Sequence, residues 1–161
     1  EDITIVPTGG LDKVASFISL LRGSKLSIFC LLDSFTDQKS QARFDSLTIQ
    51  KIISDKNIKF FHDYLDNRKK ADIEDIFTVD EYLQLFNISL SSTYTEIKVE
   101  ELSTEIEDIL SRINKVIKKS RFNHYLPAKE FASNKDFVNN LSEATLSRFE
   151  TIFKEVNKNL K

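Results

Sequence analysis

A carboxylate that directly follows an apolar run offers the clearest chemistry in this sequence. Residues 26–32 are almost entirely apolar, Asp33 comes next, and Asp37 lies four residues further on. A run of this length is typical of a strand buried on both faces of a sheet. Because ligands bind at the carboxyl ends of parallel strands, we expect Asp33 to stand at a binding edge. For Asp37, capping of a following helix is the competing interpretation.

A second acidic group occupies residues 72–77, where Asp72, Glu74 and Asp75 alternate with apolar neighbours. In an extended segment, Asp72 and Glu74 would share one face and Asp75 would point away. Clusters that contain only oxygen ligands suit Mg²⁺ or Mn²⁺ rather than zinc. A solvated surface run is the alternative, and proximity to a strand end favours the metal site.

Other kinds of catalytic site find little support. His62 and His124 are far apart, and no cluster of His and Cys has zinc spacing. Neither a phosphate-binding glycine loop nor a Gly-x-Ser-x-Gly elbow occurs. Lys129 follows a proline in what we expect to be a short link between helices. There its ammonium could neutralise a phosphate or a developing charge, with an ordinary surface lysine as the alternative.

Charge and cysteine content narrow the class of protein. Over 161 residues, 23 Lys and Arg stand against 25 Asp and Glu, which gives a net charge of −2. This balance argues against tight passive binding to duplex DNA, but it is compatible with a metal-dependent nuclease because bound cations reverse the local charge. Cys30 has no partner for an intrachain disulfide, and a signal peptide and a membrane-spanning apolar run are both missing. We therefore expect a cytoplasmic protein with no membrane contact.

The elements that must position these side chains follow from hydrophobic periodicity. In the first half, the sequence predicts strands at 3–6, 26–32 and 58–62, and helices at 11–22 and 38–55. This alternation predicts an α/β fold, with a parallel sheet and right-handed crossovers. The second half predicts helices at 79–87, 99–119 and 141–158. We therefore expect an α/β core over 1–90 and a helical C-terminal part over 91–161 packed on that core.

Several of these pieces occur in the order found in one family. They are Ile-Val-Pro-Thr-Gly-Gly at 5–10, Leu-Leu-Asp at 31–33, Asp-Ile-Glu-Asp-Ile-Phe at 72–77, and Lys129 with Phe-Ala at 131–132. Together they resemble the C-terminal Toprim domain of OLD-family nucleases over residues 3–132. Those are ATPase-linked nucleases that include Gabija-type anti-phage systems and some retron effectors.

The resemblance implies a Toprim-like parallel sheet flanked by helices and a two-metal, Mg²⁺-dependent (or Mn²⁺-dependent) endonuclease that hydrolyses DNA. One metal would activate the attacking water and the other would stabilise the leaving oxygen. Asp33 matches the first aspartate of an Asp-x-Asp motif, Glu74 with Asp72 or Asp75 matches a later acidic motif, and Lys129 matches a lysine that stabilises the transition state. The implied metal ligands are Asp33, Asp37, Asp72, Glu74 and Asp75. The implied partners are DNA, an ATPase domain of the same protein or a partner subunit, and further copies in a homo-oligomer.

Two departures from the family pattern matter. The glutamate that the family carries on its first strand is not in this chain, and Phe35 stands where the second aspartate of Asp-x-Asp should be. Asp37 is the nearest replacement, from a shifted loop. We therefore expect a domain truncated at its N-terminus that does not cleave DNA by itself.

Two other interpretations stay open. In the first, the sheet is Toprim-like but catalytically decayed, and the helical half assembles with a partner or a second copy. In the second, the chain is an unrelated receiver-like α/β domain with an acidic Mg²⁺ pocket, although the second half lacks the strand–helix units which that fold requires. Carboxylates of Asp33 and Glu74 that approach one another would favour the nuclease.

Overall fold

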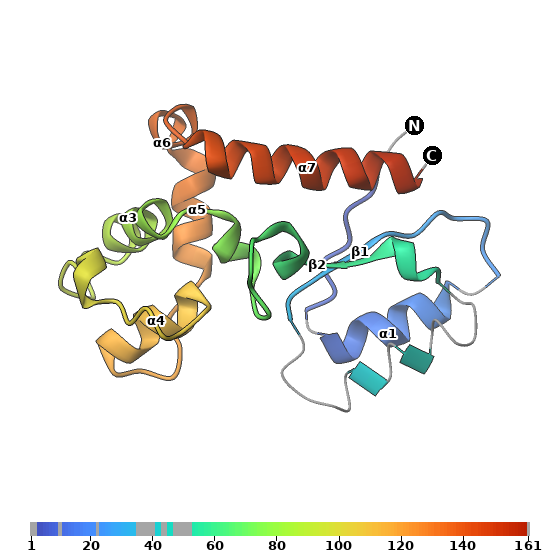
Figure 1. Cartoon of the computed structure of the whole chain (residues 1–161), viewed down its shortest axis with the longest axis horizontal. Helices are drawn as coiled ribbons and strands as arrows, with labels where there is room; N and C mark the ends of the chain where they lie inside the picture. The colour runs from blue at the N-terminus through green and yellow to red at the C-terminus, as the bar shows by residue number, and fades with distance from the viewer. Residues whose placement is uncertain are drawn as a thin grey trace.

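The computed structural model describes residues 3–9, 11–21, 23–34, 41–42, 45–46 and 53–160. These residues form a mixed α/β structure with much more helix than strand (Figure 1). In chain order the elements are α1 (Leu11–Leu20), β1 (Cys30–Leu32), the 3₁₀-helix η1 (Asp55–Asn57), β2 (Ile58–Phe60), the 3₁₀-helices η2 (Phe61–Tyr64) and η3 (Ile73–Ile76), α3 (Val79–Ser89), the 3₁₀-helix η4 (Val99–Glu101), α4 (Ile109–Ile117), α5 (Tyr125–Ser133), α6 (Lys135–Asn139) and α7 (Glu143–Leu160).

A short parallel sheet forms one end of the molecule. β1 and β2 pair in parallel, with Cys30 opposite Ile58 and Leu32 opposite Phe60. Helix α1 places Val14, Ala15 and Ile18 against the sheet in a small hydrophobic core. The predicted parallel pairing of these strands, and the helix predicted at 11–22, are confirmed. Cys30 lies in this core, and burial raises the pKa of its thiol to about 11, which suits a structural role.

Other predictions for this half were wrong or lie outside the described residues. The strand predicted at 3–6 does not form: these residues have no regular structure, and Ile5 is 87% exposed. β-branched residues favour a strand only where a neighbouring strand pairs with them, and no described strand lies along this segment. β1 and β2 are both shorter than predicted, and the chain after β2 turns at once into η2. Most of the helix predicted at 38–55 lies outside the described residues.

The helical half begins as predicted and then departs from the prediction. The helices predicted at 79–87 and 141–158 are confirmed as α3 and α7. A single helix over 99–119 is wrong, because α4 begins only at Ile109, where the Asp108 carboxylate accepts a hydrogen bond from the Ser111 amide at 2.8 Å. Lys129 lies within α5 rather than in a link between helices, since proline is tolerated in the first turn of a helix.

Three hydrophobic clusters run along the molecule. α3 and α4 enclose the largest, around Phe86 and Ile113, at the end opposite the sheet. The middle cluster joins η2 and η3 to α7 through Phe61, Ile76 and Ile152. Figure 1 shows α7 as a long helix that runs beside the helical end and the middle segment towards the sheet end.

Polar contacts join helix α7 to β2 and η2 near one of its ends and to η3 near the other. Glu155 accepts a hydrogen bond from the Tyr64 hydroxyl at 2.7 Å and pairs with the Lys59 ammonium at 3.1 Å. Near the other end of α7, Arg148 Nη1 donates to the Ile76 carbonyl at 3.1 Å. The helix therefore braces β2, η2 and η3 against one another.

A buried serine joins the end of β1 to the segment that carries the second acidic group. Ser34 is 5% exposed and its amide donates to the Ala71 carbonyl at 3.1 Å. Its hydroxyl donates to the same carbonyl at 3.2 Å, accepts from the Ala71 amide at 2.9 Å, and lies 2.8 Å from Nδ1 of His62. A hydroxyl offers one donor and two acceptor sites, so a protonated Nδ1 of His62 completes the set. We call these bonds the Ser34 clamp. They hold Ala71 beside Ser34, so the chain that follows Ala71 begins next to Asp33.

Replacement of Ser34 by alanine tests the clamp. We expect Ser34→Ala to lower the free energy of unfolding by about 1–3 kcal/mol, because the buried Ala71 amide loses its acceptor. Chemical denaturation followed by circular dichroism would measure the change. Ser19→Ala is the matched control: Ser19 is exposed, and among the described residues its hydroxyl bonds to the Ala15 carbonyl alone, so we expect it to change stability by no more than about 0.5 kcal/mol.

Candidate metal centre

Asp33 stands at the carboxyl end of β1, as the strand-end rule predicts. As a whole the residue is exposed, yet burial of its carboxyl group raises the pKa. The Ile73 amide and the charge of His124 act in the opposite direction and lower this pKa. Asp33 therefore lies near the start of η3.

Asp72 and Glu74 lie in the electrostatic field of Asp33. Burial raises the pKa of Asp72 to about 6, and the next largest cause is the charge of Asp33. Burial likewise raises the pKa of Glu74 to about 7, with Asp72 and then Asp33 as the nearest like charges. Carboxylates interact this strongly only when they are near one another and poorly solvated. The two acidic stretches singled out in the sequence are thus brought together. We call the carboxylates of Asp33, Asp72 and Glu74 the acidic rim.

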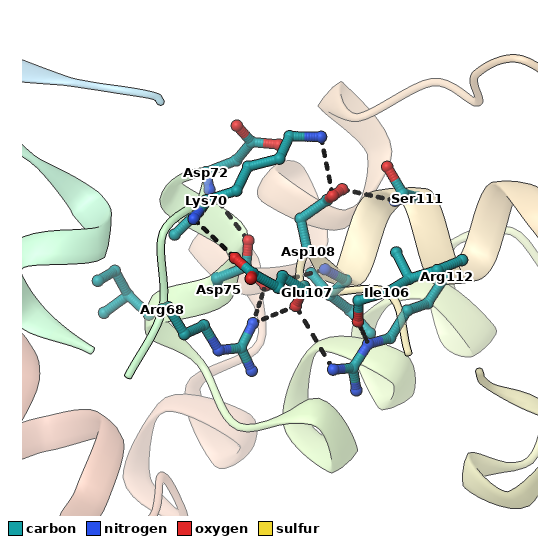
Figure 2. Close-up of polar contacts among 12 residues, drawn as sticks. Arg68, Lys70, Asp72, Asp75, Ile106, Glu107, Asp108, Ser111 and Arg112 are labelled. Atoms are coloured by element: carbon teal, nitrogen blue, oxygen red, sulfur yellow. Dashed lines mark hydrogen bonds and ion pairs between the residues drawn. The ribbon is translucent and has the colours of Figure 1, made fainter. Parts of the chain in front are cut away.

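Asp75 has a different place from the one predicted. The segment 72–77 is not extended, because Ile73–Ile76 form a 3₁₀-helix, and Asp75 turns inward with 4% exposure. Its Oδ1 accepts from Arg68 Nη1 at 3.1 Å and from the Ile109 amide at 2.9 Å, and its Oδ2 accepts from the Asp72 amide at 3.0 Å (Figure 2). Both oxygens are therefore occupied by protein donors, and a role as metal ligand would require these bonds to break.

The start of α4 is fastened to the same segment by residues that sequence reasoning missed. Lys70 Nζ pairs with Asp108 Oδ2 at 2.9 Å, and Glu107 Oε2 accepts from the amides of Lys69 at 3.0 Å and Lys70 at 2.8 Å (Figure 2). Arg68 also donates to the Glu107 carbonyl. The available signal was an aspartate directly before an apolar pair, which marks a helix start at Asp108. The pairing with 68–70 has no signal in local sequence.

Two buried polar atoms beside the carboxylates have no hydrogen-bond partner among the described residues. One is the hydroxyl of Tyr82, a residue that is 3% exposed. Burial and the charges of Glu74, Asp75 and Asp72 raise the pKa of this hydroxyl, which places it near them. The other is Nε2 of His124, whose Nδ1 lies 3.6 Å from Glu74 Oε1. Burial and then Arg121 lower the pKa of His124, so a neutral imidazole faces Glu74 at neutral pH rather than a full ion pair.

The remaining predicted site residues are not part of this cluster. Lys129 is exposed on α5, and its ammonium makes no hydrogen bond or ion pair with any residue that the structure describes. Asp37 and Phe35 lie outside the described residues. In the described part of the chain, no three His, Cys, Asp or Glu side chains are grouped closely enough to hold a metal ion.

The donor set nevertheless has the chemistry that a hard divalent cation requires. Asp33, Asp72 and Glu74 supply carboxylate oxygens. Burial raises the pKa of all three, and like charge raises the pKa of Asp72 and Glu74 further, although the Lys70 ammonium partly offsets this at Asp72. The unpartnered hydroxyl of Tyr82 and Nε2 of His124 add polar atoms that would gain partners from a hydrated ion. Asp33 and Glu74 would have to close on such an ion, and their repulsion opposes that movement until the ion is present.

The fold and this rim define a mixed α/β protein with a cluster of desolvated acids at the end of a parallel strand. No protein-family model matches the sequence, and no curated protein or solved structure is significantly similar to the chain. None of the helices in the described residues has the length and apolar character needed to cross a membrane.

Substitutions at Asp75 and Asp72 should have opposite effects on stability. We expect Asp75→Asn to lower the free energy of unfolding by about 2 kcal/mol, because the amide nitrogen of Asn cannot accept from the Asp72 amide as Oδ2 does. This loss outweighs the gain from no longer burying the Asp75 charge, a burial that raises the pKa of Asp75. Asp72→Asn should raise stability near neutral pH, since the folded state disfavours the charged Asp72 carboxylate.

The sign for Asp72 follows from linkage. Its pKa is raised on folding from 3.8 to about 6, so its protonated form supports the fold below pH 3.8, and that support is lost as the pH rises through about 6. The advantage of Asp72→Asn over the wild type should therefore vanish in acid. Urea denaturation at neutral and acid pH measures it, and a stabilised Asp75→Asn would contradict the assignment of Asp75 as a structural residue.

Proposed function

We propose that this chain is part of a divalent-metal-dependent DNA endonuclease of the OLD-family type, with a Toprim-like core. The observation that carries the proposal is the pair of hydrogen bonds between Ser34 and Ala71, which bring Asp33, at the end of β1, beside Asp72 and Glu74, at the start of η3. A metal site of this class is expected at the carboxyl end of a parallel strand. The order of motifs along the sequence supports the same family.

In this proposal, Asp33, Asp72 and Glu74 hold Mg²⁺ or Mn²⁺, which when bound supplies an activated water and stabilises the leaving oxygen of a phosphodiester. The Ser34 clamp fixes the distance between the two acidic stretches. Asp75 holds η3 in place through Arg68 and Ile109, so that Glu74 faces the rim. Lys129 lies on α5 outside the acidic cluster, so in this proposal it would contact a phosphate of the bound DNA from there.

Metal binding is the direct test. We expect the 161-residue chain to bind Mn²⁺, detected as loss of the free-ion signal in electron paramagnetic resonance, because three partly buried carboxylates make no ion pair with Lys or Arg among the described residues. Asp33→Asn and Glu74→Gln should each weaken binding at least about tenfold, as the loss of a ligand does. Asp80→Asn, which removes an exposed acid on α3, is the matched control and should bind like the wild type.

Cleavage is tested in a longer protein that carries this chain. There, Mn²⁺-dependent nicking of plasmid DNA should be abolished by Asp33→Ala, while the 161-residue chain alone should show none. Equal Mn²⁺ binding by Asp33→Asn, Glu74→Gln and the wild type would remove the metal centre and with it the proposal.

The second candidate is a catalytically decayed module for protein–protein assembly. It is favoured by the apolar side chains that α7 exposes: Leu146 is 51% and Phe153 is 61% exposed, and they lie seven residues apart on one face of the helix. Two exposed apolar side chains on one face are compatible with a helix that packs on a partner. The occupation of both Asp75 oxygens by protein donors is also compatible with a purely structural acidic segment.

Sedimentation of the chain distinguishes the two. If assembly is the function, Leu146→Glu with Phe153→Glu should convert an oligomer into a monomer, because charges would be buried in the interface. Glu150→Gln, an exposed change on the same helix, is the control. An oligomer lost on these changes, in a chain that binds no Mn²⁺, would replace the nuclease with the assembly module.

A further inference from the structure

A long stretch of the chain carries only positive charge. Residues 109–129 contain six Lys and Arg, and they contain no Asp or Glu, within a chain whose net charge is −2. The six are Arg112, Lys115, Lys118, Lys119, Arg121 and Lys129. The concentration of one sign of charge in an otherwise acidic protein creates a local field that attracts polyanions.

Five of these cations are exposed and unpaired. Lys115, Lys118, Lys119, Arg121 and Lys129 make no side-chain hydrogen bond or ion pair with any residue that the structure describes, whereas Arg112 is engaged with the carbonyls of Ile106 and Glu107. Two cations outside the stretch show the alternative arrangement: Lys59 pairs with Glu155 and Lys70 with Asp108. The positive charge of this stretch is therefore directed to solvent and not used by the fold.

The backbone brings this charge to the edge of the acidic rim. α4 ends at Ile117 and is capped by Lys118, which adopts a left-handed conformation with φ of 55°, and the chain then turns back toward α5. His124, at the start of α5, lies beside Glu74, and Arg121 is near enough to lower the pKa of His124. The positively charged stretch therefore lies next to the carboxylates of the candidate metal centre, with Arg121 near His124 and His124 beside Glu74.

An exposed aromatic ring belongs to the same positively charged stretch. Tyr125 is 68% exposed, and it is the one large hydrophobic residue in 109–129 that is exposed. An aromatic ring among unpaired cations is the arrangement with which proteins bind single-stranded nucleic acid, since the ring stacks on an unpaired base and the cations follow the phosphates. An anionic membrane surface would also attract the cations, but it offers no unpaired base on which the Tyr125 ring could stack.

We propose that Lys115, Lys118, Lys119, Arg121, Tyr125 and Lys129, which we call the basic surface, bind the backbone of a single-stranded nucleic acid, with Tyr125 stacked on an unpaired base. The basic surface would lead such a strand to the carboxylates of Asp33 and Glu74. This path to the carboxylates rests on the proposed function, but binding of the strand does not. Duplex DNA would engage the cations alone, because its bases are stacked and paired.

The charge contribution is tested by the salt dependence of binding. Fluorescence anisotropy of a labelled single-stranded oligonucleotide, with EDTA present to exclude metal, gives the affinity over a series of salt concentrations. The triple variant Lys118→Gln, Lys119→Gln, Arg121→Gln should reduce the slope of log K against log salt by about 2, since each phosphate neutralised on a single strand contributes about 0.7. Lys25→Gln, Lys56→Gln, Lys158→Gln removes the same charge from other exposed positions and should leave the slope nearly unchanged.

The stacking contribution is tested at Tyr125. Tyr125→Ala should weaken binding of the single strand about tenfold, while Tyr125→Phe keeps the ring and should bind like the wild type. Neither change should alter binding of a duplex of the same sequence, whose base faces are covered. Circular dichroism of each variant would verify folding, and the exposed position of Tyr125 makes folding insensitive to these changes.

Three results would overturn the inference. The first is equal loss of slope in both triple variants, which would reflect net charge alone. The second is equal weakening of single-strand and duplex binding by Tyr125→Ala. The third is tighter binding to vesicles of phosphatidylserine than to the oligonucleotide. Strand binding without Mn²⁺ binding would support the basic surface and refute the proposed function, and Mn²⁺ binding without strand binding would do the reverse.

Discussion

The acidic rim exists because one serine satisfies a buried backbone that would otherwise lack partners. Ala71 is fully buried between two stretches far apart in sequence, and both its amide and its carbonyl bond to Ser34. An amide buried without an acceptor is costly, so this pairing fixes where the chain after Ala71 begins. That starting point decides that Asp72 and Glu74 face Asp33 rather than solvent. A two-stranded sheet would be too small to impose this by itself.

The acids of this region divide into two groups with different physics. Asp108 and Glu81 accept hydrogen bonds from several protein donors, and such bonds lower their pKa values, that of Glu81 to about 2. Asp75 accepts similar bonds, but burial outweighs them and its pKa is raised. Asp33, Asp72 and Glu74 are partly desolvated near like charge, and their pKa values are raised. The first group stabilises the fold at neutral pH, while the second costs stability there. Carboxylates that destabilise the fold in this way are commonly found at binding sites.

Sequence alone predicted the parts of the fold that depend on local pattern. The periodicity of α1, α3 and α7 and the apolar run into β1 were read correctly, and the strand-end rule put Asp33 near the second acidic group. The helix expected over 99–119 failed because Asp108 and Glu107 serve the segment 68–70, which is remote in sequence. The inward turn of Asp75 and the approach of His124 to Glu74 depend on tertiary packing in the same way. Resemblance to a nuclease family remains a prediction.

Helix α7 gives the rim a mechanical property. Asp33 belongs to the sheet end, while Glu74 belongs to the middle segment, which packs on α7 through Ile76. The same helix contacts β2 through the ion pair of Glu155 with Lys59 and η2 through the hydrogen bond of Glu155 with Tyr64. It therefore bridges the two parts of the fold that carry the two carboxylates. A rotation of α7 would change the gap between those carboxylates, and with it their grip on a cation. A partner that binds the outer face of α7 would therefore change the spacing of the acidic rim without contacting it.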